Sequence, residues 1–303
     1  MSSIRILYYH RITSDLDDYN FTNVSPDNLA IQLKYLIDNY KIVKLRDIVD
    51  PKALKDDEET IVITFDDGYA NVIDNALPTL KKYSIPATFF ITTENIDEQG
   101  ENWTDAVIRV ALQPCRYNNE LSLDLDGKQY TWRTDVLEKR VEMYRSVRGM
   151  LGAMNHDKRR EVLNHLNEWA GIPNEARESR RIMNREEILE LSKTDGMDIG
   201  AHTVTHPFLT SLTDDEISWE ISESKRRLEE ITGTPVTSFA YPFGQFSEAI
   251  IQKVKDSGFE MAVTCTEGVV TTETDLMQIP RYDTRNYDRY GFEKFMKEKV
   301  FAT

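Results

Sequence analysis

Short apolar runs alternate with longer stretches of helical periodicity along most of the chain. Strands that are apolar throughout and separated by helices are typical of a parallel sheet covered by helices. The runs predicted as strands are Ile4–Tyr9, Lys41–Leu45, Ile61–Phe65, Thr88–Thr92, Met197–Ala201, Ser238–Tyr241, Met261–Thr264 and Met277–Arg281.

Three stretches between these strands have the pattern of amphipathic helices: Pro26–Asn39, Asp214–Ile231 and Phe246–Ser257. The second of them has the clearest ends. It follows Thr213, has acidic residues in its first turn and stops at Gly233, as helix capping and the helix dipole favour.

About eight strand–helix units in one chain predict an α/β fold in which the parallel sheet closes, or nearly closes, into a barrel. The alternative is an open doubly wound sheet. Such a sheet normally has a glycine-rich phosphate loop after its first strand, and this sequence has none.

The segment from Ile96 to Arg181 interrupts the alternation, because it has little β pattern but two helical windows, Asp135–Met150 and His156–Ala170. We therefore predict a single domain over residues 1–303 with a helical insertion at about 96–181. Residues 133–185 carry twelve Lys and Arg against eight Asp and Glu. This local positive charge indicates either a solvated pair of helices or a surface for an anionic partner.

Composition narrows the function classes. The 303 residues include 40% apolar ones and have a net charge of −15, which predicts a folded core and argues against nucleic acid as a partner. The two cysteines, Cys115 and Cys265, are too few for a disulfide framework or a cysteine-ligated zinc site. We find no signal-peptide pattern and no membrane-spanning stretch, and we expect a cytoplasmic protein.

Polar residues gather at the carboxyl ends of the predicted strands, where barrels keep their active sites. The strand Ile61–Phe65 runs directly into Asp66, Asp67 and Gly68. Adjacent side chains of an extended chain point in opposite directions, so the two acids can have different roles. The same three residues also form an ordinary turn, and this explanation stays open.

A pair of histidines follows another predicted strand. His202 and His206 are four residues apart, and one helical turn between them would direct both imidazoles at the same point, as a single metal ion requires. Pro207 limits any such helix to one short turn. His10 also ends a strand, and a single histidine near an N-terminus is usually structural.

In combination these segments resemble the polysaccharide deacetylase family, carbohydrate esterase family 4, whose shared unit is the nodulation-factor deacetylase (NodB) homology domain. Thr64-Phe-Asp-Asp-Gly68 resembles the first family motif and His202-Thr-Val-Thr-His206 the second, while Ala240-Tyr-Pro-Phe-Gly244 resembles a degenerate third. The resemblance follows the chain in order, outside the insertion, and implies a distorted (β/α) barrel.

The resemblance also implies one divalent metal ion, most commonly Zn²⁺, held by Asp67, His202 and His206. Asp66 would be the general base, and the backbone N–H of Phe243 would stabilise the oxyanion. Two imidazoles and one carboxylate leave coordination positions open for water and substrate, as a catalytic zinc site requires.

Two departures from the family pattern concern the other catalytic residues. The arginine that usually opens the third motif and holds the catalytic aspartate is replaced by Ala240, and we expect Arg281 to take its place. The usual C-terminal histidine is also missing, because no histidine follows His206. Some branches of the family have permuted motifs, and Leu7-Tyr-Tyr-His10 resembles that of the poly-N-acetylglucosamine deacetylases, so His10 is the candidate general acid.

The sequence thus predicts a metal-dependent hydrolase that removes an N-acetyl or similar short acyl group from an amino sugar in a polysaccharide or glycan precursor. The alternatives are an O-deacetylase or deformylase acting on a lipid-linked sugar, and an inactive carbohydrate-binding barrel. The charge of the insertion, with Trp103, Trp132 and Trp169 in or near it, gives the further hypothesis of an anionic or membrane-associated substrate guided by residues such as Arg159 and Arg160.

Overall fold

The computed structural model describes residues 4–16, 22–49, 59–98, 100–112, 118–173 and 175–302. Its main sheet has eight parallel strands in the order β11-β10-β9-β6-β5-β1-β12, with β4 beside β5. Their bounds are β1 Ile4–Tyr9, β4 Lys41–Ile42, β5 Thr60–Phe65, β6 Ala87–Ile91, β9 Met197–Ala201, β10 Ser238–Ala240, β11 Met261–Val263 and β12 Tyr282–Asp283.

One bent segment joins the two ends of this sheet. Ile279 forms a parallel bridge with Val263 of β11, whereas Tyr282 pairs with Leu7 of β1. The expected regular strand Met277–Arg281 is therefore wrong. The chain changes partner within it, and Pro280, which has no N–H to donate, lies at the change. This closure curls the sheet into a distorted barrel, as predicted.

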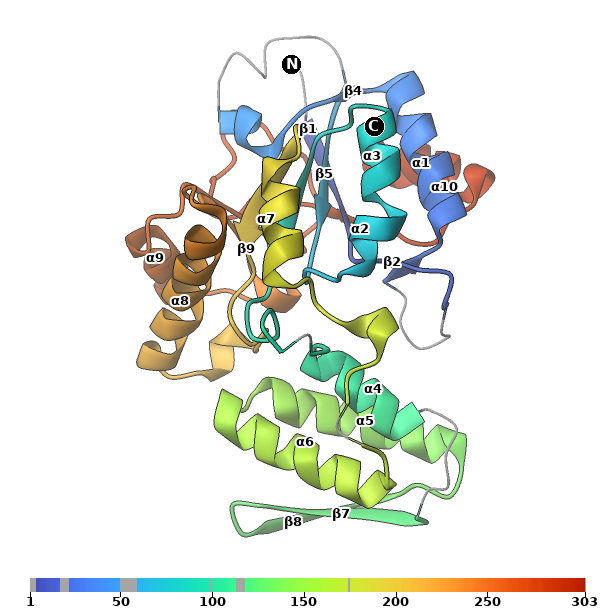
Figure 1. Cartoon of the computed structure of the whole chain (residues 1–303), viewed down its shortest axis with the longest axis vertical. Helices are drawn as coiled ribbons and strands as arrows, with labels where there is room; N and C mark the ends of the chain where they lie inside the picture. Colours follow the sequence, from blue (N-terminus) through green and yellow to red (C-terminus); the bar gives the residue numbers. More distant parts are fainter. Residues whose placement is uncertain are drawn as a thin grey trace.

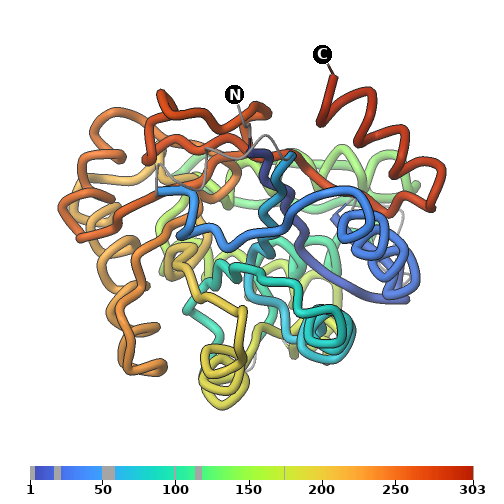
Figure 2. Tube along the Cα trace, turned by 90° about the horizontal axis from the view of Figure 1, so that it is seen from above, coloured from blue at the N-terminus to red at the C-terminus, as the bar shows by residue number. Residues whose placement is uncertain are grey.

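Helices cover the outside of the strands (Figures 1 and 2). They are α1 Pro26–Asn39, α2 Asn71–Asn75, α3 Leu77–Lys82, α7 Arg185–Lys193, α8 Asp214–Thr232, α9 Glu248–Asp256 and α10 Arg289–Phe295. The expected ends of α8 are confirmed, because Thr213 forms a capping box with Glu216 and Gly233 adopts a left-handed conformation. No helix in the described part of the chain has the length and apolar composition needed to cross a membrane.

The strands separate two hydrophobic cores because their side chains alternate between the faces of the sheet. In β5, Ile61, Ile63 and Phe65 pack outward against the helices, whereas Val62 packs inward. Phe90 of β6 belongs to the same inner core, which fills the barrel. The polar residues of the motifs lie beyond this inner core, at the carboxyl ends of the strands.

The insertion forms a layer of its own beyond one end of the barrel (Figure 1). It contains α4 Trp103–Leu112, β7 Glu120–Leu125, β8 Lys128–Arg133, α5 Leu137–Gly152 and α6 His156–Ala170, which share a third hydrophobic core. The two helical windows are confirmed, but the antiparallel hairpin β7–β8 was not predicted. Its signal is present in the sequence as alternating leucines in β7 followed by the turn Asp126-Gly127, in which both residues have positive φ.

Short elements complete the described chain. They are the strands β2 Arg11–Ile12 and β3 Asn23–Val24, the 3-10 turns Leu45–Val49, Glu178–Arg180, Leu209–Ser211 and Pro242–Gly244, and a π-helical turn at Met296–Val300. β2 and β3 pair with each other in parallel. β2 and the turn Glu178–Arg180 meet where the insertion joins the barrel, and each carries a buried arginine, Arg11 and Arg180.

Candidate active site

Asp67, His202 and His206 converge at the carboxyl ends of β5 and β9. The Asp67 Oδ1 atom lies 3.4 Å from His202 Nε2 and 3.3 Å from His206 Nε2, and the two Nε2 atoms are 3.2 Å apart. All three side chains are buried, and they are the one group of three potential metal ligands found among the described residues.

This triangle fits a metal ion. Ligand atoms about 2.0–2.1 Å from a zinc ion, at tetrahedral angles, stand about 3.3–3.4 Å from one another. The observed separations agree with that spacing. Asp67 Oδ1 is also buried without a hydrogen-bond donor, as a ligand atom awaiting a cation would be.

The backbone of both ligand segments is unusual. Asp67 has φ 72°, Thr203 φ 67° and His206 φ 54°, so the expected helical turn between the two histidines is wrong. Positive φ in residues other than glycine costs free energy and persists only where the surroundings impose it. At Gly68 a glycine is required, because φ is +81° and a Cβ atom would lie 2.7 Å from the Ile91 side chain.

Hydrogen bonds and charge prepare the histidines for ligation. The Nδ1 atom of His202 lies 2.7 Å from the carbonyl oxygen of Ala240. That oxygen can only accept, so Nδ1 carries a hydrogen, and in the neutral ring that can bind a metal ion Nε2 is the atom with the lone pair. Burial lowers the pKa of His206 to about 3, which outweighs the opposing charge of Asp67 and keeps this imidazole neutral.

Asp66 is held by Arg281 in a buried bidentate ion pair. The Nη1 and Nη2 atoms of Arg281 donate to the two carboxylate oxygens at 2.8 and 2.7 Å. Arg281 also donates to Thr64 Oγ1 and the Thr264 carbonyl, and its guanidinium lies over the Tyr8 ring. Burial alone would raise the pKa of Asp66, but the charge and hydrogen bonds of Arg281 outweigh it and hold the pKa below its usual value.

His10 and Phe243 lie at the edge of this group. The pairing of Tyr9 with Phe65 places His10 level with Asp66 on the neighbouring strand end, and the charge of His10 contributes to lowering the pKa of Asp66. The half-buried His10 has an Nδ1 atom without a hydrogen-bond partner. Phe243 has φ 56°, and its ring centroid is 4.5 Å from that of His206.

Three residues outside the motifs support the second ligand segment. Glu220 of α8 accepts hydrogen bonds from the backbone N–H groups of Val204 and Thr205 at 2.8 and 2.9 Å. Trp103 donates from Nε1 to the His206 carbonyl at 2.9 Å, and Arg159 donates to the Thr205 carbonyl at 2.7 Å. Of the three, only Glu220 has a sequence signal, because it is a charged residue on the apolar face of its helix.

The contacts of Trp103 and Arg159 correct part of the guidance hypothesis. Both side chains are almost fully buried and bind the backbone of the ligand loop, so neither is available to a glycan in solution. Trp169 donates from Nε1 to the Glu120 carbonyl within the insertion. Arg160 is exposed. Guidance of an anionic substrate therefore stays a prediction for exposed arginines of the insertion such as this one.

Comparisons with known proteins agree with the motifs. A family model described as polysaccharide deacetylase matches residues 53–120 and 151–262, more than half of the chain. YxkH of Bacillus subtilis, which is named for the same family, is 21% identical over 283 residues, or 92% of this chain and 71% of its own length. A poly-β-1,6-N-acetyl-D-glucosamine N-deacetylase of Staphylococcus aureus is 29% identical over 109 residues, which is 35% of this chain and 37% of that enzyme.

Solved structures share the fold at low identity. The deacetylase PplD of Streptococcus pyogenes superposes with a TM-score of 0.63 and 19% identity, over 97% of this chain and 98% of its own. IcaB of Ammonifex degensii superposes with a TM-score of 0.60 and 17% identity, over 98% and 97%. These similarities confirm the predicted distorted (β/α) barrel.

The first prediction concerns the metal. Asp67→Ala, His202→Ala and His206→Ala should each abolish stoichiometric binding of a divalent ion, because each removes a ligand that the other two cannot replace. Metal analysis of the dialysed variants, with exposed Arg160→Ala as the control, measures this. Full occupancy in any of the three ligand variants would refute the assignment of that residue.

The second prediction concerns the ion pair. Arg281→Met leaves the buried Asp66 charge without a partner and should lower the free energy of unfolding by about 3–5 kcal/mol at neutral pH. Arg281→Lys retains a charge and should lose less, although it cannot make the bidentate contact. Urea unfolding of both variants tests this, and equal losses would show that the charge is not what stabilises the pair.

Proposed function

The chain belongs to the polysaccharide deacetylase family, as its motifs predict, and from this premise we propose that it is a metal-dependent carbohydrate N-deacetylase. Its substrate is an N-acetylated amino sugar, or one with a similar short acyl group, in a polysaccharide or glycan precursor. The observation that carries the proposal is the convergence of Asp67, His202 and His206 beside the Asp66–Arg281 pair. The curated relatives named for N-deacetylation support it.

Asp67, His202 and His206 would hold the metal, which we propose to be Zn²⁺ because imidazole and carboxylate are its common catalytic ligands. A divalent ion bound there supplies Lewis-acid chemistry, which makes water a better nucleophile and the amide carbonyl a better electrophile. The neutral state of His206 suits this role, since a protonated imidazole has no lone pair on Nε2 to offer.

Asp66 is the general base of the proposal. Its lowered pKa keeps it ionised at neutral pH, and Arg281, from the segment that bridges β11 and β1, fixes its orientation. A carboxylate accepts about four hydrogen bonds, so the two from Arg281 leave lone pairs for the proton of an attacking water.

His10 is the proposed general acid. An amine anion is too basic to leave, so amide hydrolysis requires a proton on the departing nitrogen. His10 lies beside Asp66 on the neighbouring strand, and a protonated imidazole can donate that proton. We assign the backbone N–H of Phe243, in the strained turn beside His206, to the oxyanion.

An inactive carbohydrate-binding barrel fits the site less well. A third motif without its arginine would favour inactivity, but Arg281 makes a bidentate contact with Asp66 in this chain. A barrel that only binds glycans has no need of a base held beside three ligand atoms. O-deacetylation and deformylation would use the same catalytic residues, so an O-acetylated substrate is needed to distinguish ester from amide hydrolysis.

The third prediction tests the function directly. The metal-loaded protein should release acetate from N-acetylated chito-oligosaccharides, and a chelator should abolish this. Asp66→Asn keeps the shape of the side chain but removes the base, so turnover should fall by about 10²-fold or more while metal content stays at the wild-type level. Asp66→Asn at wild-type activity would place the base elsewhere, and acetate release only from O-acetyl groups would establish the esterase alternative.

The fourth prediction separates acid catalysis from structure at His10. His10→Ala should retain metal and melting temperature but lose about 10²-fold in amide hydrolysis. It should lose much less on an activated acetate ester, whose leaving group departs without a proton. Equal losses on amide and ester would assign His10 a structural role.

A further inference from the structure

The two ends of the insertion meet directly against the first ligand segment. We call residues 100–105 and 177–183 the insertion stem. Within the stem, Ile182 donates its N–H to the Gly100 carbonyl at 3.0 Å. Tyr69 forms an antiparallel bridge with Ile182, and Met183 donates to the Gly68 carbonyl at 2.8 Å. The turn that carries Asp67 is therefore continued by backbone hydrogen bonds into the insertion.

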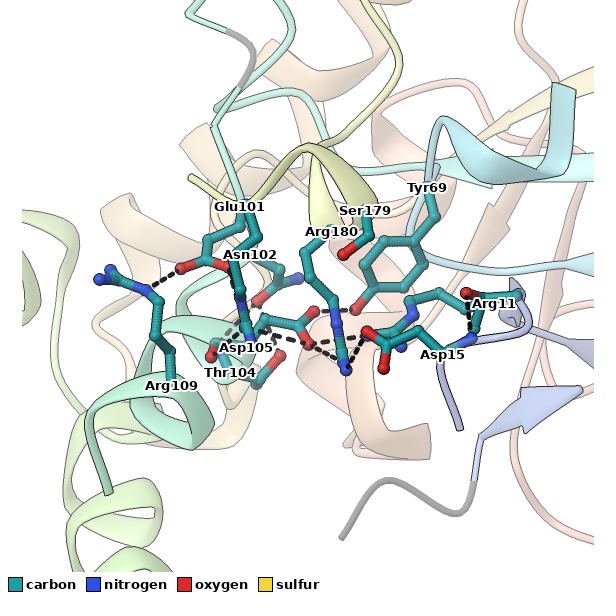
Figure 3. A network of polar contacts seen from close by, with 12 residues as sticks. Arg11, Asp15, Tyr69, Glu101, Asn102, Thr104, Asp105, Arg109, Ser179 and Arg180 are labelled. Atoms are coloured by element: carbon teal, nitrogen blue, oxygen red, sulfur yellow. Dashed lines mark hydrogen bonds and ion pairs between the residues drawn. The ribbon is translucent and has the colours of Figure 1, made fainter. Parts of the chain in front are cut away.

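A buried side-chain network crosses the same junction, with Asp105 at its centre (Figure 3). The Asp105 carboxylate is fully buried and accepts hydrogen bonds from the Tyr69 hydroxyl at 2.6 Å and Arg11 Nη1 at 3.1 Å. Arg180 Nη1 donates to it at 2.9 Å. Tyr69 comes two residues after Asp67, and Arg11 directly follows His10. One carboxylate of the insertion therefore binds side chains that are close in sequence to two residues of the proposed active site.

Stability alone does not account for this charge. Burial is the strongest influence on the pKa of Asp105 and raises it to about 6, despite the opposing charge of Arg11 and hydrogen bond from Tyr69. A carboxyl with a higher pKa in the folded than in the unfolded protein favours folding when protonated. Keeping Asp105 ionised above pH 6 therefore costs folding free energy, and buried ion pairs are often replaceable by apolar residues without loss of stability.

We propose that Asp105 is a positioning residue, through which the insertion sets the placement of Asp67 and His10 relative to each other. The inference rests on the proposed function, because it assigns the insertion a part in the same site. The backbone pairing of Tyr69 with the stem fixes the turn along the chain, and the Tyr69 hydroxyl and Arg11 guanidinium, meeting on one carboxylate, fix the distance between the two strand ends.

A neighbouring carboxylate of the same network provides a matched control. Glu101 lies in the stem with a side chain that is 4% exposed, against 1% for Asp105, and it pairs with Arg109 at 2.6 Å and with Arg177 at 2.9 Å. These ion pairs do not involve Arg11, and the Tyr69 hydroxyl donates to Asp105 instead. Glu101→Gln therefore removes a largely buried charge from the insertion while the bonds from Tyr69 and Arg11 to Asp105 stay in place.

The experiment measures zinc affinity by chelator competition, and kcat and KM, well below the melting temperature of every variant. Asp105→Asn should weaken zinc binding by about 10-fold and lower kcat by a similar factor, as loss of an indirect support for a ligand does. Tyr69→Phe should act in the same direction, and the double variant should lose no more than Asp105→Asn alone, because the Tyr69 hydroxyl acts through Asp105. Glu101→Gln should change zinc affinity and kcat by less than about 2-fold, even where it lowers the melting temperature equally.

Three outcomes would overturn the inference: wild-type zinc affinity and kcat in Asp105→Asn, equal losses in Glu101→Gln, or additive losses in the double variant. Zinc affinity distinguishes this inference from the proposed function. A wild-type protein that binds zinc but releases no acetate would refute the function, while the comparison of zinc affinities among the variants would still decide whether Asp105 positions the ligand segment.

Discussion

The bidentate contact between Arg281 and Asp66 joins the segment directly before β12 to the first motif across the interior of the barrel. Both groups are buried, and an unpaired charge at either position would be strongly destabilising. The contact requires the bent segment that bonds first to β11 and then to β1, because only that path brings Arg281 over Tyr8 to the end of β5. Closure of the barrel and ionisation of Asp66 therefore depend on the same interaction.

The loops that carry Asp67 and His206 have the opposite character, since neither is stable by local preference. Asp67, Thr203 and His206 all adopt positive φ, and their surroundings must impose it. Glu220 from α8 and Arg159 from α6 hold the second loop, while the stem of the insertion continues the first. The insertion thus contacts both loops of the site, the first through its stem and the second through Arg159. It is therefore part of the structure that supports the site.

The position of the supporting arginine shows how the site tolerates rearrangement in sequence. Ala240 stands where the third motif usually has an arginine, and its carbonyl accepts from His202 instead. Arg281, directly before β12, donates to both carboxylate oxygens of Asp66. Strands distant in the chain end at one rim of a barrel, so the guanidinium can come from any strand end that lies close enough.

The sequence by itself determined the alternation of strands and helices and the boundaries of α1, α6 and β9, and it indicated Asp67, His202 and His206 as one group of potential metal ligands, because apolar periodicity, capping and motif spacing are local signals. It also pointed to Arg281 as the partner of Asp66, but only as a substitution for a missing residue. The bend at Pro280, the non-helical loop between His202 and His206, and the roles of Trp103, Glu220 and Asp105 were decided by tertiary structure alone. Each depends on a contact between residues far apart in the chain, and a local pattern carries no information about which distant group will satisfy a buried charge or backbone dipole.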